Sequence, residues 1–313
     1  MKFKWGWIVF GIILVNVFFI GIRYLQLQSN IEKFLEPNPN YPASNKSEKN
    51  NQQISTATIQ TNTVRKNINK VETPVFPKIA IVLDDLGIKT VDYNLLDKIP
   101  YKLNLAIIPG MKDSRMLVKE YAQDGRYEIL LHMPMQPIIR KEDQESRYIE
   151  HPRRYPYILE TKQTAKQMIK QLDSALDSLE GSGIVVGFNN HMGSAITSSK
   201  NIMNTVLNWG KSRELYFLDS MTTAATVGYE LAKKKKMPAL YNEVFLDGTA
   251  TEEYIENQLA KARRLASKNG YVVVIGHITR EKTLETLVSE MPRMAEEGYE
   301  FVFLSDILKL SKK

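Results

Sequence analysis

The chain has 313 residues and contains no cysteine. This absence excludes disulfides, thiolate metal ligands and cysteine nucleophiles. Histidine is scarce, with 4 residues, so any metal site needs carboxylate ligands as well. No strand-like segment leads into a glycine-rich nucleotide-binding fingerprint, and the sequence has neither a GxSxG motif nor a P-loop. Hydrophobic residues at 43% and charged residues at 25% match a globular protein and exclude wholesale disorder or fibrous repeats.

The N-terminal segment is the longest uncharged stretch. Residues 5–22 (WGWIVFGIILVNVFFIGI) are mostly apolar and follow Lys2 and Lys4. A helix of about 18 such residues nearly spans the ~30 Å hydrocarbon core of a bilayer. Because no small-x-small cleavage site follows, we interpret residues 1–23 as an uncleaved membrane signal anchor. A cleaved signal peptide and a soluble amphipathic helix are the alternatives.

The charge distribution favours an extracytoplasmic body. Lys2 and Lys4 favour a cytoplasmic N-terminus, which would place the rest of the chain outside the cytoplasm as a single-pass membrane protein. The excess of 42 Lys and Arg over 35 Asp and Glu gives a formal net charge of +7. Beside a membrane anchor, this charge fits anionic lipid or cell-wall polymers better than nucleic acid. The four lysines at 233–236 are interpreted as the solvated end of a helix.

Two further segments follow the anchor. Residues 24–77 are rich in Asn, Gln, Ser, Thr, Lys and Pro, which predicts a flexible polar linker. Folded sequence begins abruptly at Lys78. The remaining residues, 78–313, are close to the ~250 residues of a (β/α) barrel.

The folded part alternates between two hydrophobic patterns. Short apolar runs rich in β-branched and aromatic residues predict buried parallel strands; they occupy residues 79–83, 103–108, 128–131, 183–188, 215–218, 244–246, 271–276 and 301–304. Segments with helical spacing lie between them, at residues 164–179, 202–209, 252–267 and 284–295. Alternation of this kind predicts right-handed crossovers and a parallel sheet. About eight units favour a closed or nearly closed barrel over an open doubly wound sheet.

Polar residues gather where these runs end. The Asp and His residues at or near these ends are Asp84, Asp85, His132, His191, Asp219, Asp247 and His277. Because the carboxyl ends of parallel strands meet on one face, we expect these side chains to form one site. The fourth histidine, His151, lies in a polar stretch and is interpreted as a loop residue.

The residue types at these ends suit hydrolysis assisted by a metal. Two neutral imidazoles and one carboxylate are a common open zinc site. A second carboxylate must then accept the proton of the attacking water, and an acid must protonate the leaving group. The adjacent Asp84 and Asp85 suit such a division of labour, although two aspartates after a strand are by themselves an ordinary loop start. Asp219 either orients a ligand or His277, or caps the following helix, and Asp247 is interpreted as the start of a turn.

Six motifs in order identify a resemblance. They are IAIVLDDLG, LNLAIIPG, LLHMPMQP, GFNNHMGS, YFLDS and VFLD. In this order the chain resembles the divergent polysaccharide deacetylases, a YibQ-like branch of the NodB-homology carbohydrate esterases, over essentially all of residues 78–313. The resemblance implies an α/β fold, a distorted (β/α)7–8 barrel, and hydrolysis of N-acetyl groups on a polysaccharide or peptidoglycan-type substrate with a divalent metal, for which zinc is favoured.

The resemblance also implies roles for four residues. Asp84 resembles the general base and Asp85 the metal-binding carboxylate, while His132 resembles the first ligand histidine and His277 the catalytic acid. A second ligand histidine is expected four residues after the first, where this chain has Gln136. We therefore predict that His191, at the end of the neighbouring strand, completes the metal site.

Other positions bear on substrate and turnover. We predict that Asn189, Asn190 and Gln136 bind substrate and that Asp219 assists catalysis. Met221 stands where the family commonly has Arg, and Ile278 where it often has Pro. These departures favour, as an alternative, a catalytically weak deacetylase fold that binds glycan or assists envelope assembly. A glycosidase with paired carboxylates is a third reading. The sequence does not indicate an oligomeric state.

Overall fold

The computed structural model describes residues 76–88, 91, 93–139, 155–179 and 183–310. The predicted anchor, nearly all of the predicted linker and His151 therefore lie outside the described residues. Within the described ranges, no helix combines the length and apolar character needed to cross a membrane.

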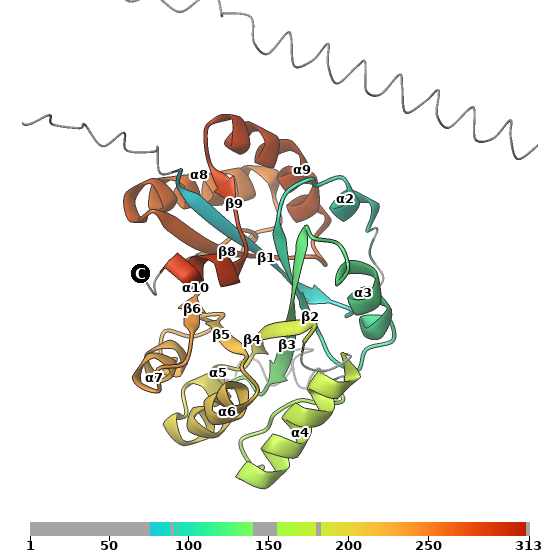
Figure 1. Cartoon of the computed structure of the whole chain (residues 1–313), viewed down its shortest axis with the longest axis vertical. Coiled ribbons are helices and arrows are strands. Elements are labelled where there is room, and N and C mark those ends of the chain that lie inside the picture. Colours follow the sequence, from blue (N-terminus) through green and yellow to red (C-terminus); the bar gives the residue numbers. More distant parts are fainter. Residues whose placement is uncertain (1–75, 89–90, 92, 140–154, 180–182, 311–313) are drawn as a thin grey trace, which may run out of the picture. The chain divides into compact units, whose positions relative to one another are not determined.

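One parallel sheet forms the centre of the described region (Figure 1). Its strands are β1 (Lys78–Leu86), β2 (Leu103–Ile107), β3 (Tyr127–Met135), β4 (Val185–Met192), β5 (Tyr216–Asp219), β6 (Ala239–Tyr241), β7 (Val244–Phe245), β8 (Tyr271–His277) and β9 (Glu300–Phe301). Eight of them follow the order β6-β5-β4-β3-β2-β1-β8-β7, and β9 pairs with the first residues of β1. Every strand pairing is parallel, as the alternating sequence pattern predicts.

Helices surround the curled sheet (Figure 1). They are α2 (Asn94–Asp97), α3 (Ser114–Tyr121), α4 (Ala165–Ser178), α5 (Ser194–Thr197), α6 (Lys200–Ser212), α7 (Gly228–Lys234), α8 (Glu252–Asn269), α9 (Glu281–Glu296) and α10 (Leu304–Leu310). The four helices expected from apolar spacing correspond to α4, α6, α8 and α9. Helix α4 begins as its sequence requires, because the Thr164 hydroxyl accepts a hydrogen bond from the Gln167 backbone N–H and the Gln167 side chain accepts one from the Thr164 backbone N–H.

The sheet curls into a half-barrel and stays open between β6 and β7, the two ends of the strand order. This corrects the expectation of a closed or nearly closed barrel. Only Asn242 and Glu243 separate the two strands in sequence, and parallel partners need a crossover of roughly a dozen residues. Glu243 instead bridges across to β8: its N–H donates to the Val273 carbonyl at 3.0 Å, and its carboxylate accepts from the Val273 N–H at 3.0 Å.

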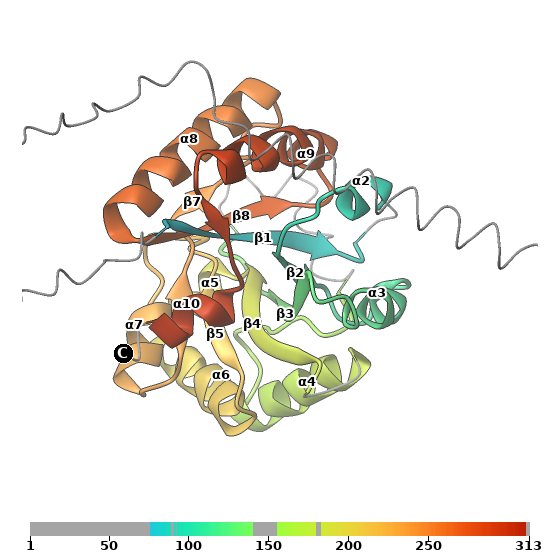
Figure 2. The ribbon, with the colours of Figure 1, turned by 45° about the horizontal axis from the view of Figure 1, so that its top comes forward.

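The concave side of the sheet is filled from its amino end by α10 (Figure 2). The Asn104 side chain on β2 accepts from the Leu304 N–H at 2.9 Å, and the Glu128 carboxylate on β3 accepts from the Ser305 N–H at 3.2 Å. Leu304, with Ile307 of the same helix, packs against buried residues of the inner sheet face. Because α10 occupies the amino end of the sheet, the carboxyl ends of the strands are the face available for a site.

Candidate metal centre

The two adjacent aspartates of β1 both reach the site because the strand is irregular where they stand. Successive residues of a regular strand point to opposite faces. Here the register of β1 against β2 shifts between Leu83 and Leu86, and Asp85 adopts a left-handed backbone with φ of 69°. Such a conformation is uncommon for a residue with a side chain, and strained backbone of this kind clusters at functional sites. The shift turns the Asp85 carboxylate toward the same centre as Asp84.

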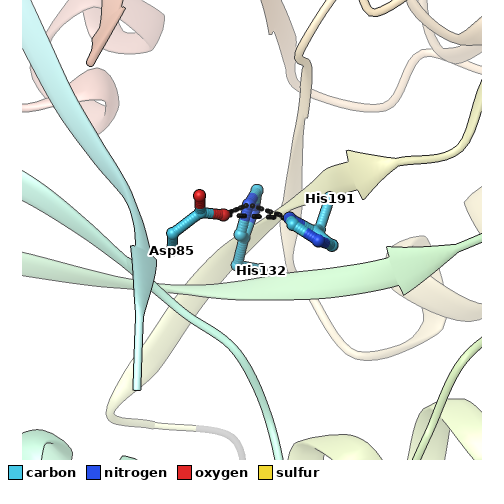
Figure 3. Close-up of side chains that lie close together, drawn as sticks. All are labelled: Asp85, His132 and His191. Carbon is cyan, nitrogen blue, oxygen red and sulfur yellow. Dashed lines mark hydrogen bonds and ion pairs between the residues drawn. The ribbon is translucent and has the colours of Figure 1, made fainter. Parts of the chain in front are cut away.

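Asp85, His132 and His191 come together from β1, β3 and β4 (Figure 3). Asp85 Oδ1 lies 3.3 Å from His132 Nε2 and 2.9 Å from His191 Nδ1. The two ring nitrogens are 3.2 Å apart. The three residues that sequence reasoning assigned to the metal therefore form one compact cluster, with the His132 side chain 2% exposed and that of His191 13% exposed.

The donor set fits a divalent metal. In a tetrahedral site with bonds of roughly 2.0–2.1 Å, neighbouring ligand atoms lie about 3.3 Å apart, close to the separations in this cluster. Asp85 Oδ1 is buried and receives no hydrogen bond of good geometry from the described residues, although two ring nitrogens face it. A buried carboxylate oxygen aimed at two imidazole nitrogens is the arrangement that a shared cation would satisfy.

Asn189 fixes the tautomer of His132. Its side-chain N–H donates to Asp84 Oδ1 at 2.9 Å, so its amide oxygen must face His132 Nδ1, which lies 2.8 Å away. An amide oxygen only accepts, and His132 Nδ1 must therefore carry the proton. The lone pair of Nε2 is then left pointing at the cluster, as a metal ligand requires. Asn189 is completely buried, which makes it a positioning residue that links Asp84 of β1 to His132 of β3.

Tyr155 has the equivalent position beside His191. Its hydroxyl lies 3.0 Å from His191 Nε2, and the two rings meet edge-on with centroids 4.9 Å apart. If His191 carries its proton on Nε2 and donates it to the tyrosine oxygen, His191 Nδ1 is unprotonated and its lone pair faces Asp85. Tyr155 packs with Ile108 and Ile158 in a small apolar cluster, which fixes the ring beside His191.

Burial and neighbouring groups shift the pKa values of Asp84 and Asp85 in opposite directions. Burial raises the pKa of Asp84, and the charges of His132 and His277 only partly oppose this effect. Burial also acts on Asp85, but the two imidazoles of His132 and His191 beside its carboxylate outweigh burial and hold the Asp85 pKa well below its usual value. Asp85 is thus kept ionised, as a ligand must be, whereas Asp84 has the stronger affinity for a proton.

Contacts with Asp247 raise the pKa of His277. His277 Nδ1 lies 2.7 Å from Asp247 Oδ1, and the His277 backbone N–H donates to Oδ2 at 2.7 Å. Thr283 also donates to Oδ2, at 2.6 Å. Burial lowers the pKa of His277, but the hydrogen bond and charge of Asp247 outweigh burial and raise it to about 9. His277 is the strand neighbour of Asp84, so a proton acceptor and a proton donor stand side by side.

Several predicted site residues have other contacts. Asp219 does not contact His277 or the cluster, which corrects its assignment as a catalytic residue. Its carboxylate accepts from the Thr226 hydroxyl at 2.7 Å and from the Tyr229 N–H at 3.0 Å, and it shapes the turn before α7. Asp247, which the sequence suggested was only a turn residue, has the contact expected of Asp219. A turn such as DGT does not reveal that its aspartate reaches a neighbouring strand.

The predicted substrate ligands also serve the scaffold. Asn190 accepts from the Ser220 N–H at 3.0 Å and donates to the Met192 carbonyl at 2.7 Å. The Gln136 side chain accepts from the Thr161 N–H at 2.8 Å, and it holds the segment after the undescribed residues 140–154 against β3. Tyr155 was missed, because a tyrosine in a polar stretch gives no periodic signal.

The fold and these contacts define a parallel α/β half-barrel with a possible Asp-His-His metal site. A family model for divergent polysaccharide deacetylases matches residues 81–308. This match covers most of the chain, and the protein belongs to the divergent polysaccharide deacetylase family.

Other proteins are similar to this chain in sequence or in structure. The chain is 29% identical over 220 residues to an uncharacterized protein of Haemophilus influenzae, covering 70% of this chain and 73% of that protein. It is 28% identical over 217 residues to YibQ of Escherichia coli K12, covering 69% of this chain and 63% of YibQ. The crystal structure of ATU2773 from Agrobacterium tumefaciens C58 matches with a TM-score of 0.65 and 21% identity, covering 75% of this chain and 90% of that chain. This structural likeness supports the fold alone.

Proposed function

We propose that the protein is a metal-dependent hydrolase that removes N-acetyl groups from an extracytoplasmic polysaccharide, with peptidoglycan-type glycans as the first candidates. One observation carries the proposal: Asp85, His132 and His191 form a compact donor set beside a second carboxylate, Asp84, and a histidine with a raised pKa, His277. Membership of the deacetylase family supplies the substrate class.

Each side chain has a task in this proposal. A divalent metal, zinc in our proposal, would be held by Asp85, His132 and His191 and would act as a Lewis acid that polarises the acetamide carbonyl and acidifies the attacking water. Asp84 accepts the proton of that water, which its raised pKa favours. His277 donates its proton to the departing sugar amine, which its pKa of about 9 permits at neutral pH.

The positions of Asp84 and His277 support these two tasks. Asp84 Oδ2 lies 3.6 Å from His132 Nε2, so the base stands at the edge of the donor set and its other oxygen is held by Asn189. The His277 side chain is 25% exposed, which lets a leaving group reach it, whereas the Asp247 side chain behind it is completely buried. These positions support the proposal that Asp84 takes the proton of the water and that His277 gives its proton to the amine.

The cellular setting is proposed from the sequence. Residues 1–23 would anchor the chain in the membrane, residues 24–77 would act as a tether, and the domain at 78–313 would face the extracytoplasmic side. A reporter enzyme that is active only outside the cytoplasm, fused after residue 77, tests this topology. Activity of the fusion is expected, and its absence would contradict the orientation.

The decisive experiment measures acetate release by the full chain, purified in a detergent without a sugar headgroup. Substrates are N-acetylglucosamine oligomers and peptidoglycan, with and without chelator, and metal content is determined in parallel. His132→Ala and His191→Ala are expected to lose both metal and acetate release. His151→Ala, the remaining histidine, is the matched control and is expected to keep both.

Two further variants separate binding from chemistry. Asp84→Asn and His277→Gln are expected to keep the metal and lose acetate release. Stoichiometric metal with glycan binding but no acetate release would support the alternative that the fold binds glycan or assists envelope assembly; Met221 in place of the usual Arg favours this alternative. New reducing ends without acetate would indicate a glycosidase.

A further inference from the structure

A hollow lies beside β6, at the open edge of the half-barrel and away from the candidate metal centre. Its volume is about 350 Å³. It is lined from four elements and one turn by Tyr229, Lys233, Lys236, Met237, Pro238, Ala239, Leu240, Tyr271 and Leu308. Ala239 and Tyr271 are the first residues of β6 and β8, whereas the metal cluster stands at the carboxyl ends of its strands. The hollow and the cluster are therefore at opposite ends of the sheet.

Two lysines of the run 233–236 line this hollow, and neither forms an ion pair with a described residue. Lys233 holds its ammonium 5.1 Å from the centre of the Tyr229 ring. Lys236 is exposed and adopts a left-handed backbone with φ of 53°. In contrast, Lys235 donates to the Asn208 side chain at 2.8 Å, and Lys234 does not line the hollow. The run ends α7 and is largely exposed, as the sequence predicts, but its members have different surroundings.

The walls combine aromatic faces with hydroxyl groups. Tyr229 and Tyr271 supply the aromatic faces of the lining. The Tyr229 ring packs against the ring of Tyr241, which is not a lining residue, with centroids 4.7 Å apart. Burial raises the pKa of Tyr229 and of Tyr271, so both hydroxyls stay protonated and available as donors. The buried floor is apolar and is formed by Met237 and Leu240.

We propose that this hollow binds an acidic saccharide unit, a pyranose ring that carries a carboxylate or phosphate group. The two ammonium groups supply the charge that the acidic group requires. Tyrosine faces suit the C–H face of a pyranose, and tyrosine hydroxyls suit its hydroxyl groups. A volume near the lower end of the ~300–1,000 Å³ range of ligand pockets fits one sugar unit better than a nucleotide or a helix. This site is separate from the proposed catalytic centre and does not depend on it.

The test uses the full chain with isotope-labelled methionine methyl groups, in a detergent without a sugar headgroup. The Met237 methyl reports on the hollow, and the Met192 methyl, next to His191, reports on the metal centre. The probes are glucuronate and glucose 6-phosphate, compared with glucose, acetate, benzoate and inorganic phosphate. Saturable shifts of the Met237 resonance with the two acidic sugars, and much weaker shifts with the other four compounds, are expected.

Matched lysine variants locate the site. Lys236→Gln is expected to weaken glucuronate binding about threefold to fivefold. Lys234→Gln removes the same charge from the same run and is expected to leave the affinity nearly unchanged, because solvent and salt screen its longer-range effect. Tyr229→Ala is expected to weaken glucuronate and glucose 6-phosphate alike, and circular dichroism checks its folding.

Several results would overturn the proposal of an acidic saccharide site. Equal shifts with glucose would remove the need for charge, and equal shifts with acetate, benzoate or inorganic phosphate would remove the need for a sugar. Equal effects of Lys236→Gln and Lys234→Gln, or no Met237 shift with any probe, would also overturn the proposal. Glucuronate binding should persist in Asp85→Asn without metal, so failure of the catalytic proposal and failure of this one give different results.

Discussion

Asp247 contacts His277 at two points, the imidazole and the backbone N–H, each at 2.7 Å. The two contacts fix the orientation of the ring and its charge at once. Thr283 also donates to Asp247. This bond fixes the carboxylate that in turn fixes His277. This arrangement is expected of a histidine that acts as a general acid and must be protonated before the reaction.

Asp247→Asn is expected to lower the pKa of His277 from about 9 toward its ordinary value of 6.5. The amide keeps the size of the carboxylate but loses the charge that stabilises the imidazolium. An NMR titration of labelled histidine measures this pKa, and the alkaline limb of any acetate-release profile should move to lower pH. Asp219→Asn is the matched control, since Asp219 has no contact with His277. A His277 pKa unchanged in Asp247→Asn would contradict the assignment.

The same pair predicts how stability depends on pH. The raised pKa of His277 stabilises the folded state fully below 6.5, and this contribution is lost as the pH rises through about 9. The lowered pKa of Asp247 stabilises above its ordinary 3.8 and is lost as the pH falls through the lower, folded value. Urea unfolding at several pH values should therefore show a decline between pH 6.5 and 9 that is smaller in Asp247→Asn.

Much of the fold could be predicted because parallel strands buried on both faces have a plain hydrophobic signature. The runs ending at Asp84, His132 and His277 are all strands of one parallel sheet. The sequence could not show that the barrel stays open. Closure depends on β6 and β7, which have three and two residues and only Asn242 and Glu243 between them. Strands this short give no periodicity to count.

The candidate site was predicted as far as residue types at strand ends allow. Asp85, His132 and His191 meet because strand ends converge, which is a property of topology. The side chains that orient them could not be predicted: the contact of Tyr155 with His191, or of Asp247 with His277, depends on loop conformation. Loops carry no repeating pattern, and their contacts are set by tertiary packing.

Asn189→Ala is expected to weaken zinc binding about tenfold to a hundredfold. Without the amide oxygen, His132 is free to carry its proton on Nε2, the nitrogen that faces Asp85. Competition with a zinc-binding dye measures the affinity in the full chain. Asn190→Ala is the control, because this neighbouring amide is equally a scaffold residue but does not touch a candidate ligand. An equal loss in both variants would mean that general loosening of β4, and not the His132 tautomer, controls the affinity.

Tyr155→Phe is expected to weaken zinc binding about tenfold. The change removes the hydroxyl 3.0 Å from His191 Nε2 and leaves the ring in place to pack. Tyr157→Phe removes a hydroxyl two residues away that has no partner among the described residues, and its zinc affinity should match that of the unmodified chain. If the Tyr155 variant also matched, the hydroxyl would not position His191.

Gly187→Ala is expected to lower the free energy of unfolding by about 1–3 kcal/mol. A Cβ at this position would overlap the ring of Tyr216, which is buried inside the half-barrel and held by its hydroxyl bond to Glu128 at 2.6 Å. Gly125→Ala is the control, because no heavy atom lies within 4 Å of its added Cβ and its φ is not positive. Urea unfolding in the presence of chelator measures both variants.

A second substitution tests the cause. Tyr216→Leu removes the ring that the new methyl group would meet, so Gly187→Ala should cost less in the Tyr216→Leu background than in the original chain. The difference between the two costs is the coupling between positions 187 and 216, expected at about 0.5–3 kcal/mol for residues in contact. A cost independent of the side chain at position 216 would mean that Gly187 is required for backbone freedom, although its φ lies outside the left-handed region.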